Sequence, residues 1–226
     1  SRCKANGLAA FPISFSCPVS AGYKIIISFF INRQTCKLKK KKKTFALTLA
    51  LMLMLCAGAQ EKWPPLDNSP MDVIYLPVDY PILKIRKAAL EIPVMKIIYS
   101  RPQKKNRKVF GELVEYGSVW RLGANEATEL DLFKDIKIAN TRIRKGRYTL
   151  YAIPYKEKWT IIINKENDVW GSFAYDEKKD ILRTDVKTVK NMEPVESFTM
   201  MFEGTDKGAN LLITWEDVKV SLPVTL

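Results

Sequence analysis

The side chains best suited to chemistry lie close together in the sequence, between residues 101 and 128. Guanidinium groups bind carboxylate or phosphate oxygens in pairs, an indole offers a face for stacking, and an amide beside a carboxylate can orient a polar ligand. All of these groups occur here, and Trp170, next to a glycine, adds a second candidate stacking face. We therefore predict a binding corner for an anionic glycan or a peptide carboxylate, formed by Arg101, Arg107, Trp120, Arg121, Asn125, Glu126 and Trp170.

A structural role suits the same residues. Arg121 or Arg107 could pair with Glu126, because buried charges persist in proteins only when they are paired. The basic run from residue 101 to residue 108 could equally be a solvated turn whose arginines bond to loop carbonyls. Under this alternative the segment is an internal clamp of a purely structural envelope domain.

Three carboxylates offer an enzymatic alternative to simple binding. Glu126, Glu129 and Asp131 are close enough in sequence for the acid and base pair of a glycosidase, which would make the protein a hydrolase of envelope polysaccharide. Glu129 and Asp131 are two apart in a predicted strand and share its solvent-side face, the ordinary place for charged residues. If the protein is instead a binding module, as we predict first, it has no catalytic residue.

The composition excludes many other reactions. The chain has no His, and its four Cys residues all precede Gln60. From residue 60 onward there is therefore no Ser-His-Asp or Cys-His nucleophile system, no zinc site built from His or Cys, and no disulfide. P-loop, EF-hand and dinucleotide-binding motifs are absent as well. We predict no cofactor and no metal site.

The net charge of +13 suggests a nucleic-acid-binding protein until the charges are located. Ten of the 37 basic residues and none of the 24 acidic residues lie before Gln60, so the remainder carries a net charge of only +3. Such a balance is normal for a soluble domain, and it removes the electrostatic argument for DNA or RNA as a partner.

Five of the ten basic residues before Gln60 lie at the start of a predicted export signal. Residues 39–43 are all Lys, residues 44–55 are largely apolar, and Ala57, Gly58 and Ala59 provide a cleavage site. We predict a signal peptide over 38–59 and a protein of the periplasm or exterior, without a membrane span after cleavage. Lipid attachment at Cys56 is an alternative. Residues 1–37 contain no Met, and we interpret them as untranslated upstream sequence or a disordered segment.

The rest of the chain is predicted to be one all-β domain, a β-sandwich or jelly roll of nine or ten short strands. Residues 60–92 contain many prolines and should form an extended arm, with the β-domain over 93–226. Alternating apolar residues mark strands at 94–100, 128–133, 135–139, 141–144, 147–153, 159–164, 181–189, 195–203, 209–215 and 218–224. The best core candidates are Ile161, Ile163, Phe198, Met200, Phe202, Leu211 and Ile213.

Several motifs connect the chain to a known family. They include LDNSPMD at 66–72, YSRP at 99–102, YGSVWRLGANEAT at 116–128, GRYTL at 146–150 and WTIIINK at 159–165. With these motifs the chain resembles, over about residues 63–226, an exported bacterial family known as domain of unknown function 2911, of the kind found in Bacteroidetes-type genomes. The resemblance implies an exported, β-rich domain of the cell envelope and implies no activity.

Overall fold

The structure is a computed structural model that describes residues 63–88 and 92–226. The chain divides into two compact units, Ser1–Trp63 and Pro64–Leu226, and every element reported below belongs to the second. The predicted upstream segment and signal peptide lie outside the described residues. The elements are β1 (Met71–Leu76), α2 (Tyr80–Ile85), β2 (Met95–Ser100), β3 (Thr128–Leu132), β4 (Ile136–Ile138), β5 (Thr141–Ile143), β6 (Gly146–Pro154), β7 (Lys158–Asn164), the 3₁₀ turn η1 (Glu177–Lys179), β8 (Asp180–Thr205) and β9 (Gly208–Thr225).

The described strands form one antiparallel sheet of nine strands in the order β1-β2-β3-β6-β7-β8-β9-β4-β5. Every pair in this order is antiparallel, and the hairpins β6–β7 and β8–β9 join strands that follow each other in the chain. The prediction of an all-β fold is confirmed. The short connections between neighbouring strands explain why the turn residues marked the sheet so clearly in the sequence.

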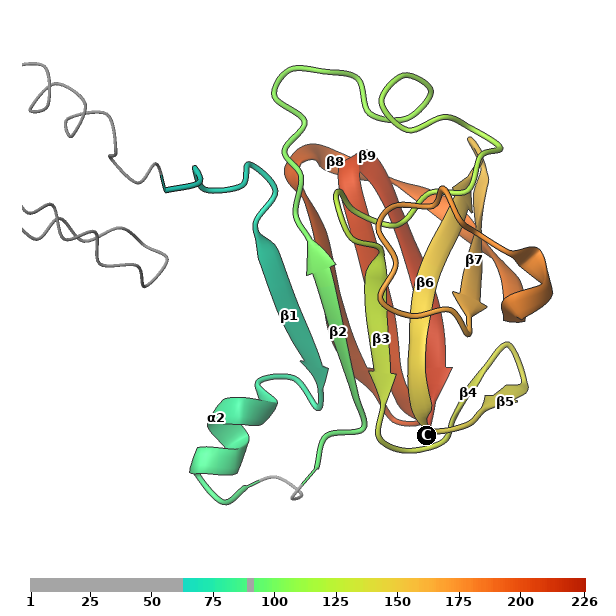
Figure 1. Ribbon diagram of the computed structural model, residues 1–226. Coiled ribbons are helices and arrows are strands. Elements are labelled where there is room, and N and C mark those ends of the chain that lie inside the picture. Colours follow the sequence, from blue (N-terminus) through green and yellow to red (C-terminus); the bar gives the residue numbers. More distant parts are fainter. Residues whose placement is uncertain (1–62, 89–91) are drawn as a thin grey trace, which may run out of the picture. The chain divides into compact units, whose positions relative to one another are not determined.

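The sheet bends over at β8, so that its two halves lie face to face (Figure 1). The first part of β8 pairs with β7, and the remainder pairs with β9. In Figure 1 the long β8 and β9 pass behind β1, β2, β3 and β6. A direct bond joins the two layers, because the hydroxyl of Tyr99 in β2 donates to the carbonyl of Met200 in β8 at 3.2 Å.

The core fills the space between the layers. Phe198, Met200 and Phe202 alternate along β8 and are buried, as are Leu211 and Ile213 on β9. Ile161 and Ile163 of β7 belong to the same cluster. All seven core residues predicted from the period-two pattern are therefore confirmed, because neighbours two apart on a strand share a face.

Two strands are much longer than the alternating pattern indicated. The predicted strands 181–189 and 195–203 are one continuous strand, β8, and 209–215 and 218–224 are one strand, β9. Asn191 and Pro194 look like turn residues, but they sit where the β8–β9 register shifts between Lys190 and Val195. Glu216 has a φ of 53° at the matching interruption in β9. Turn residues therefore mark bulges here instead of strand ends.

The proline-rich segment contains regular structure. Residues 71–76 form β1, which pairs with β2 from Met71 opposite Ser100 to Leu76 opposite Met95. Pro81 lies in the first turn of the short helix α2, where its missing N–H has no partner to lose. No helix in the described ranges is long and apolar enough to cross a membrane. The prolines on either side of β1 hid the strand in the sequence.

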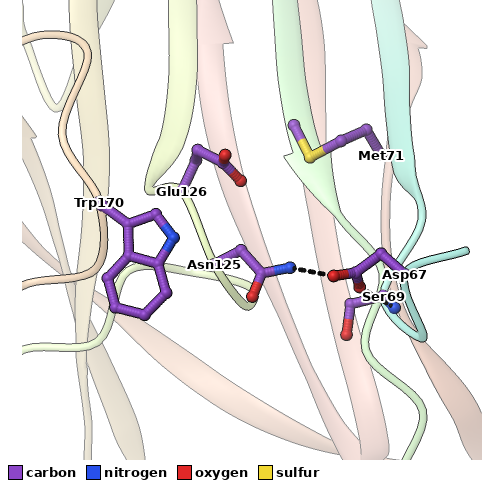
Figure 2. Close-up of a pocket in the computed structure, with 6 residues that line it drawn as sticks. All are labelled: Asp67, Ser69, Met71, Asn125, Glu126 and Trp170. Carbon is purple, nitrogen blue, oxygen red and sulfur yellow. Dashed lines mark hydrogen bonds between the residues drawn. The ribbon is translucent and has the colours of Figure 1, made fainter. Parts of the chain in front are cut away.

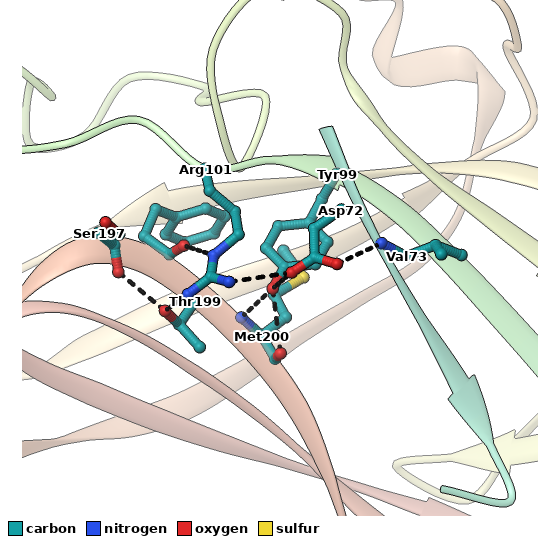
Figure 3. Close-up of polar contacts among 8 residues, drawn as sticks. Asp72, Val73, Tyr99, Arg101, Ser197, Thr199 and Met200 are labelled. Atoms are coloured by element: carbon teal, nitrogen blue, oxygen red, sulfur yellow. Dashed lines mark hydrogen bonds and ion pairs between the residues drawn. The ribbon is translucent and has the colours of Figure 1, made fainter. Parts of the chain in front are cut away.

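A polar cluster fastens β1 and β2 to β8 (Figure 3). The guanidinium of Arg101 donates to Asp72 at 3.0 Å, to the Thr199 hydroxyl at 2.9 Å and to the Phe198 carbonyl at 3.2 Å. The Tyr99 hydroxyl accepts from the backbone N–H of Met200 at 3.1 Å. Burial raises the pKa of Tyr99, which keeps this hydroxyl protonated. The cluster satisfies polar groups at the point where the layers meet.

We expect Tyr99→Phe to destabilise the protein by about 1 to 2 kcal/mol, because it leaves buried backbone groups of Met200 without a partner. Urea unfolding should show the lower midpoint at an unchanged slope. Tyr155→Phe is the matched control, since the half-exposed Tyr155 hydroxyl has no hydrogen-bond partner among the described residues. A Tyr99→Phe midpoint equal to that of the control would contradict the structural role of the cluster.

Candidate functional site

The segment between β2 and β3, residues 101–127, contains no regular strand, and isolated backbone bridges hold it in place. Gln103 pairs with Ser197 of β8, Trp120 with Ala152 of β6, and Glu126 with Trp170 in the loop after β7. These bridges lead the segment from one layer, over the end of the sheet, to the start of β3. Its conformation is therefore set by contacts distant in sequence.

Trp120 lies in the core. It is 8% exposed and stacks on Trp215 with ring centroids 6.0 Å apart and an interplanar angle of 18°. Trp159 and Phe198 meet it edge on, and its indole N–H donates to the Gly123 carbonyl at 3.1 Å. The predicted stacking face of Trp120 is thus covered by other aromatic side chains.

The two arginines at the start of the segment bond within the protein. Arg101 belongs to the cluster with Asp72 and Thr199 described above. Arg107 is exposed and donates to the backbone carbonyls of Gln103 at 2.7 Å and Lys104 at 2.9 Å. This is the arrangement expected for arginines in a turn, and a ligand-binding role for either one stays a prediction.

Of the three carboxylates considered for hydrolysis, two form ion pairs on the sheet. Asp131 of β3 lies between Lys96 of β2, at 2.6 Å, and Arg147 of β6, at 3.6 Å. Glu129 also pairs with Arg147, at 3.3 Å. Glu126 is exposed and its carboxylate makes no hydrogen bond or ion pair within residues 63–88 and 92–226. Glu126 therefore differs from Glu129 and Asp131, because its carboxylate is exposed and unpaired within these ranges whereas theirs form ion pairs.

Glu126 lines an open pocket of about 430 Å³ (Figure 2). Three parts of the chain contribute: the segment that leads into β1 together with the first residue of β1, the loop before β3 and the loop after β7. Figure 2 shows Trp170 and Glu126 on one side, Asp67, Ser69 and Met71 on the other, and Asn125 between them. The lining residues are Asp67, Ser69, Met71, Asn125, Glu126 and Trp170. Asn125, Glu126 and Trp170 were predicted from the sequence, and the structure brings them together.

Asp67, Ser69 and Met71 were not predicted as site residues. They lie in the proline-rich segment, which is held against the rest of the pocket by a hydrogen bond from the Asn125 amide to Asp67 at 3.0 Å. The other Asp67 oxygen accepts from the backbone N–H of Ser69 at 2.6 Å. The one signal that could have found them is the LDNSPMD motif at 66–72, which is part of the family resemblance.

The sequence around Asn125 explains the shape of the loop before β3. Gly123 has a φ of 151°, and a Cβ at this position would lie 2.7 Å from the Ser100 hydroxyl. That hydroxyl donates to the Ala124 carbonyl at 2.5 Å and accepts from the Ala124 N–H at 2.7 Å. Asn125 follows in left-handed geometry with a φ of 58°, which Asn adopts more readily than most residues. The Gly-Ala-Asn run thus permits close packing on β2 and then turns Asn125 toward the pocket.

Trp170 is the most exposed aromatic side chain of the pocket. It is 59% exposed, and its ring lies nearly parallel to that of Phe173, with centroids 5.8 Å apart and an angle of 15°. The guanidinium carbon of Arg121 lies 5.8 Å from the Trp170 centroid. Burial lowers the pKa of Arg121. Arg121 and Glu126 form no ion pair. The internal clamp that we considered as an alternative is therefore not formed by these two side chains.

Backbone bonds align the loop after β7 with the loop before β3. The N–H of Ala127 donates to the Val169 carbonyl at 3.0 Å, and that of Gly171 donates to the Asn125 carbonyl at 2.9 Å. These bonds place Trp170 beside Glu126. The hydrogen bonds of the loop backbone therefore help to set the position of the exposed Trp170 indole, in addition to the contacts of the Trp170 side chain.

A second open pocket, of about 360 Å³, lies where the 101–127 segment meets β9. It has charges of both signs and one exposed phenol. Glu216 is committed to the fold, because its carboxylate accepts from the backbone N–H of Val109 at 3.1 Å. The lining residues are Lys104, Lys108, Phe110, Tyr116, Pro194, Glu216 and Asp217. None of the seven residues predicted to bind a ligand lines it.

The far end of the Trp170 loop is locked by a polar cluster around Asp180. The hydroxyl of Tyr175 donates to Asp180 at 2.5 Å, and Arg183 donates to the same carboxylate at 2.7 Å. The buried amide of Asn164 donates to the other Asp180 oxygen at 2.7 Å. Burial, together with the hydrogen bond to Asp180, raises the pKa of Tyr175 to about 12. The loop is thus anchored at both of its ends.

This cluster predicts a loss of stability at alkaline pH. Tyr175 keeps its proton in the folded protein up to about pH 12, whereas in the unfolded chain it titrates near its ordinary value of 10.0. Its contribution is therefore complete below about pH 10 and declines as the pH rises toward 12. Urea unfolding across this range should show the stability difference between wild type and Tyr175→Phe narrowing above about pH 10. A difference that stays constant would contradict the role of the Tyr175 proton.

No curated protein and no solved structure matches the chain. One family model does match, over residues 84–224, which include β2 to β9, the loop before β3 and Trp170. The matched range begins after Asp67, Ser69 and Met71 and covers more than half of the chain. The chain belongs to the family of proteins of unknown function DUF2911.

Proposed function

We propose that this protein is a non-enzymatic binding module for a glycan and that the pocket around Trp170 holds the ligand. One observation carries the proposal: an indole that is 59% exposed forms the wall of a pocket in which the Glu126 carboxylate has no partner among the described residues. Exposed aromatic side chains in loops commonly mark binding sites, because burial of their apolar rings would otherwise stabilise the fold.

The pocket combines the groups that a sugar ring needs. An indole packs against the apolar C–H face of a sugar, while carboxylate and amide groups exchange hydrogen bonds with its hydroxyls. Glu126 and Asp67 supply acceptors, Asn125 supplies both kinds of group, and Ser69 adds a hydroxyl. The two carboxylates favour an uncharged, hydroxyl-rich unit in the pocket over an acidic one, because like charges repel.

The cellular context of the proposal comes from the sequence. The Lys run at 39–43 and the apolar segment after it support export to the periplasm or exterior, where the protein would meet envelope glycans. A peptide or another envelope partner remains the alternative ligand for the same pocket. Glycan is preferred because the lining supplies several hydroxyl-binding groups around one exposed ring.

Hydrolysis is the second candidate function, since Asp67 and Glu126 place two carboxylates in one pocket. Asp67 already accepts hydrogen bonds at both of its oxygens, from Asn125 and from Ser69. Both oxygens of this carboxylate are therefore engaged within the protein and are not free to act on a substrate. Binding without turnover is therefore the better supported proposal.

We expect Trp170→Ala to weaken glycan binding at least about tenfold, which corresponds to about 1.4 kcal/mol. Calorimetric titration with oligosaccharides selected on a glycan array measures the change. Phe133→Ala is the control, because Phe133 is a half-exposed aromatic residue just beyond the other end of β3. Equal binding by wild type and Trp170→Ala, or no bound glycan at all, would overturn the proposal.

Glu126→Gln separates binding from hydrolysis. The amide keeps the shape of the side chain and its ability to hydrogen-bond, so we expect binding to weaken only a few-fold, about 0.5 to 1 kcal/mol. Incubation of wild type with the bound glycan should release no new reducing ends. Release by wild type that is lost in Glu126→Gln would replace the binding proposal by the hydrolase.

A further inference from the structure

Arg121 differs in its surroundings from the other arginines of the described residues. Within residues 63–88 and 92–226 only two arginines are partly buried, Arg101 and Arg121. Arg101 bonds to Asp72, Thr199 and the Phe198 carbonyl. The Arg121 side chain makes no hydrogen bond or ion pair in the same part of the chain, and its Nε is buried without a partner. A cation that has lost part of its hydration and gained no counterion is costly to the folded state.

The Arg121 guanidinium lies beside an exposed pair of aromatic rings, those of Trp170 and Phe173. The Arg121 guanidinium lies 5.8 Å from the Trp170 ring centroid, and Phe173, 82% exposed, lies nearly parallel to Trp170. Gly171, with a φ of 72°, permits this packing. A Cβ there would lie 2.8 Å from the Phe173 ring and 3.4 Å from a terminal nitrogen of Arg121. The sequence thus brings a cation and two exposed rings together at one surface.

The pocket and this cation meet at Trp170. Arg121 is not among the residues that line the pocket, whereas Trp170 both lines it and contacts Arg121. The carboxylates of the pocket and the guanidinium beside it therefore offer opposite charges to two parts of one ligand. One part of a ligand that extends across Trp170 would donate its hydroxyls to the acceptors of the pocket, and the adjoining part would lie beside the Arg121 guanidinium.

We propose that Arg121 binds the acidic group of the glycan, so that the ligand is an oligosaccharide with an uncharged unit in the pocket and an adjoining uronic acid unit over Trp170 and Phe173. This inference rests on the proposed function and adds the chemical class of the ligand. A carboxylate suits the site, because a guanidinium binds it through two parallel hydrogen bonds. The bound anion would also supply the counterion that Arg121 lacks in the protein.

A glycan array that carries matched neutral and uronic-acid-containing oligosaccharides tests the inference. The wild type should bind the acidic members more tightly, and added salt should reduce this preference, because screening weakens exposed charge pairs. In Arg121→Gln the affinity for acidic members should fall roughly tenfold to the level of their neutral counterparts, as expected when a charge-assisted pair is lost. Arg121→Lys should recover only part of it, because the ammonium lacks the planar fork.

Arg144→Gln is the matched control. Arg144 lies just before β6, is exposed, and has no hydrogen bond or ion pair through its side chain among the described residues, so the change removes the same charge away from the pocket. Calorimetry should show its preference for acidic glycans intact, and thermal unfolding should show that both Gln variants are folded.

The outcomes distinguish the two proposals. Binding of neutral and acidic members with equal affinity, lost in Trp170→Ala, would overturn the acidic ligand and leave the glycan-binding module standing. An equal loss of preference in Arg121→Gln and Arg144→Gln would also overturn the role of Arg121, because the effect would then come from net charge. Absence of binding to any member would overturn both proposals together.

Discussion

Burial of the Trp120 indole is the interaction on which the candidate site depends. Its ring is stacked on Trp215 inside the core, and its backbone exchanges hydrogen bonds with Ala152 of β6 at 2.7 and 2.9 Å. One residue is thus held in a single position in the middle of a long irregular segment. Leu122, two residues later, is also buried, so Arg121 between them is directed to the surface. Buried Trp120 and Leu122 thus hold the segment against the core although no strand is formed.

Close packing of the backbone at two glycines then connects the buried Trp120 to the loops of the pocket. Gly123 lies against Ser100 of β2, and Gly171 lies against Phe173, at distances that a side chain would not permit. The two loops that contain these glycines are joined by hydrogen bonds between Gly171 and Asn125 and between Ala127 and Val169. Glycines at these positions explain how polar loop residues can be placed accurately without regular secondary structure.

The charged residues of the segment fall into two groups with different physical roles. Arg101 and Arg107 are satisfied by the protein, one by a carboxylate and a hydroxyl and the other by loop carbonyls. The side chains of Arg121 and Glu126 have no hydrogen-bond or ion-pair partner in the described part of the chain, and both residues lie beside the exposed Trp170. The bonds of Arg101 stabilise the connection between the layers and those of Arg107 stabilise its own loop, whereas unsatisfied charges at a surface remain available to a ligand. The separation supports binding over a purely structural role.

Period-two alternation was sufficient to predict the all-β class and the buried faces of β7, β8 and β9, because one residue in two must face the core. Local pattern could not show that Asn191 and Pro194 lie at a bulge, since the same residues end strands elsewhere. It also could not show β1, whose six residues are enclosed by prolines and gain their order from pairing with β2.

For the site, residue types alone identified Asn125, Glu126 and Trp170, because a carboxamide, a carboxylate and an indole beside glycines are unusual in a turn. They also suggested Trp120 as a stacking face, and nothing local distinguishes it from Trp170. Each tryptophan stands next to loop residues in the sequence, and only packing against Trp159, Trp215 and Phe198 buries one of them. The sequence by itself determined the fold class and the chemistry available. The tertiary structure decided which of these groups are buried, paired or left accessible in the pocket, because burial and pairing depend on contacts between residues far apart in the chain.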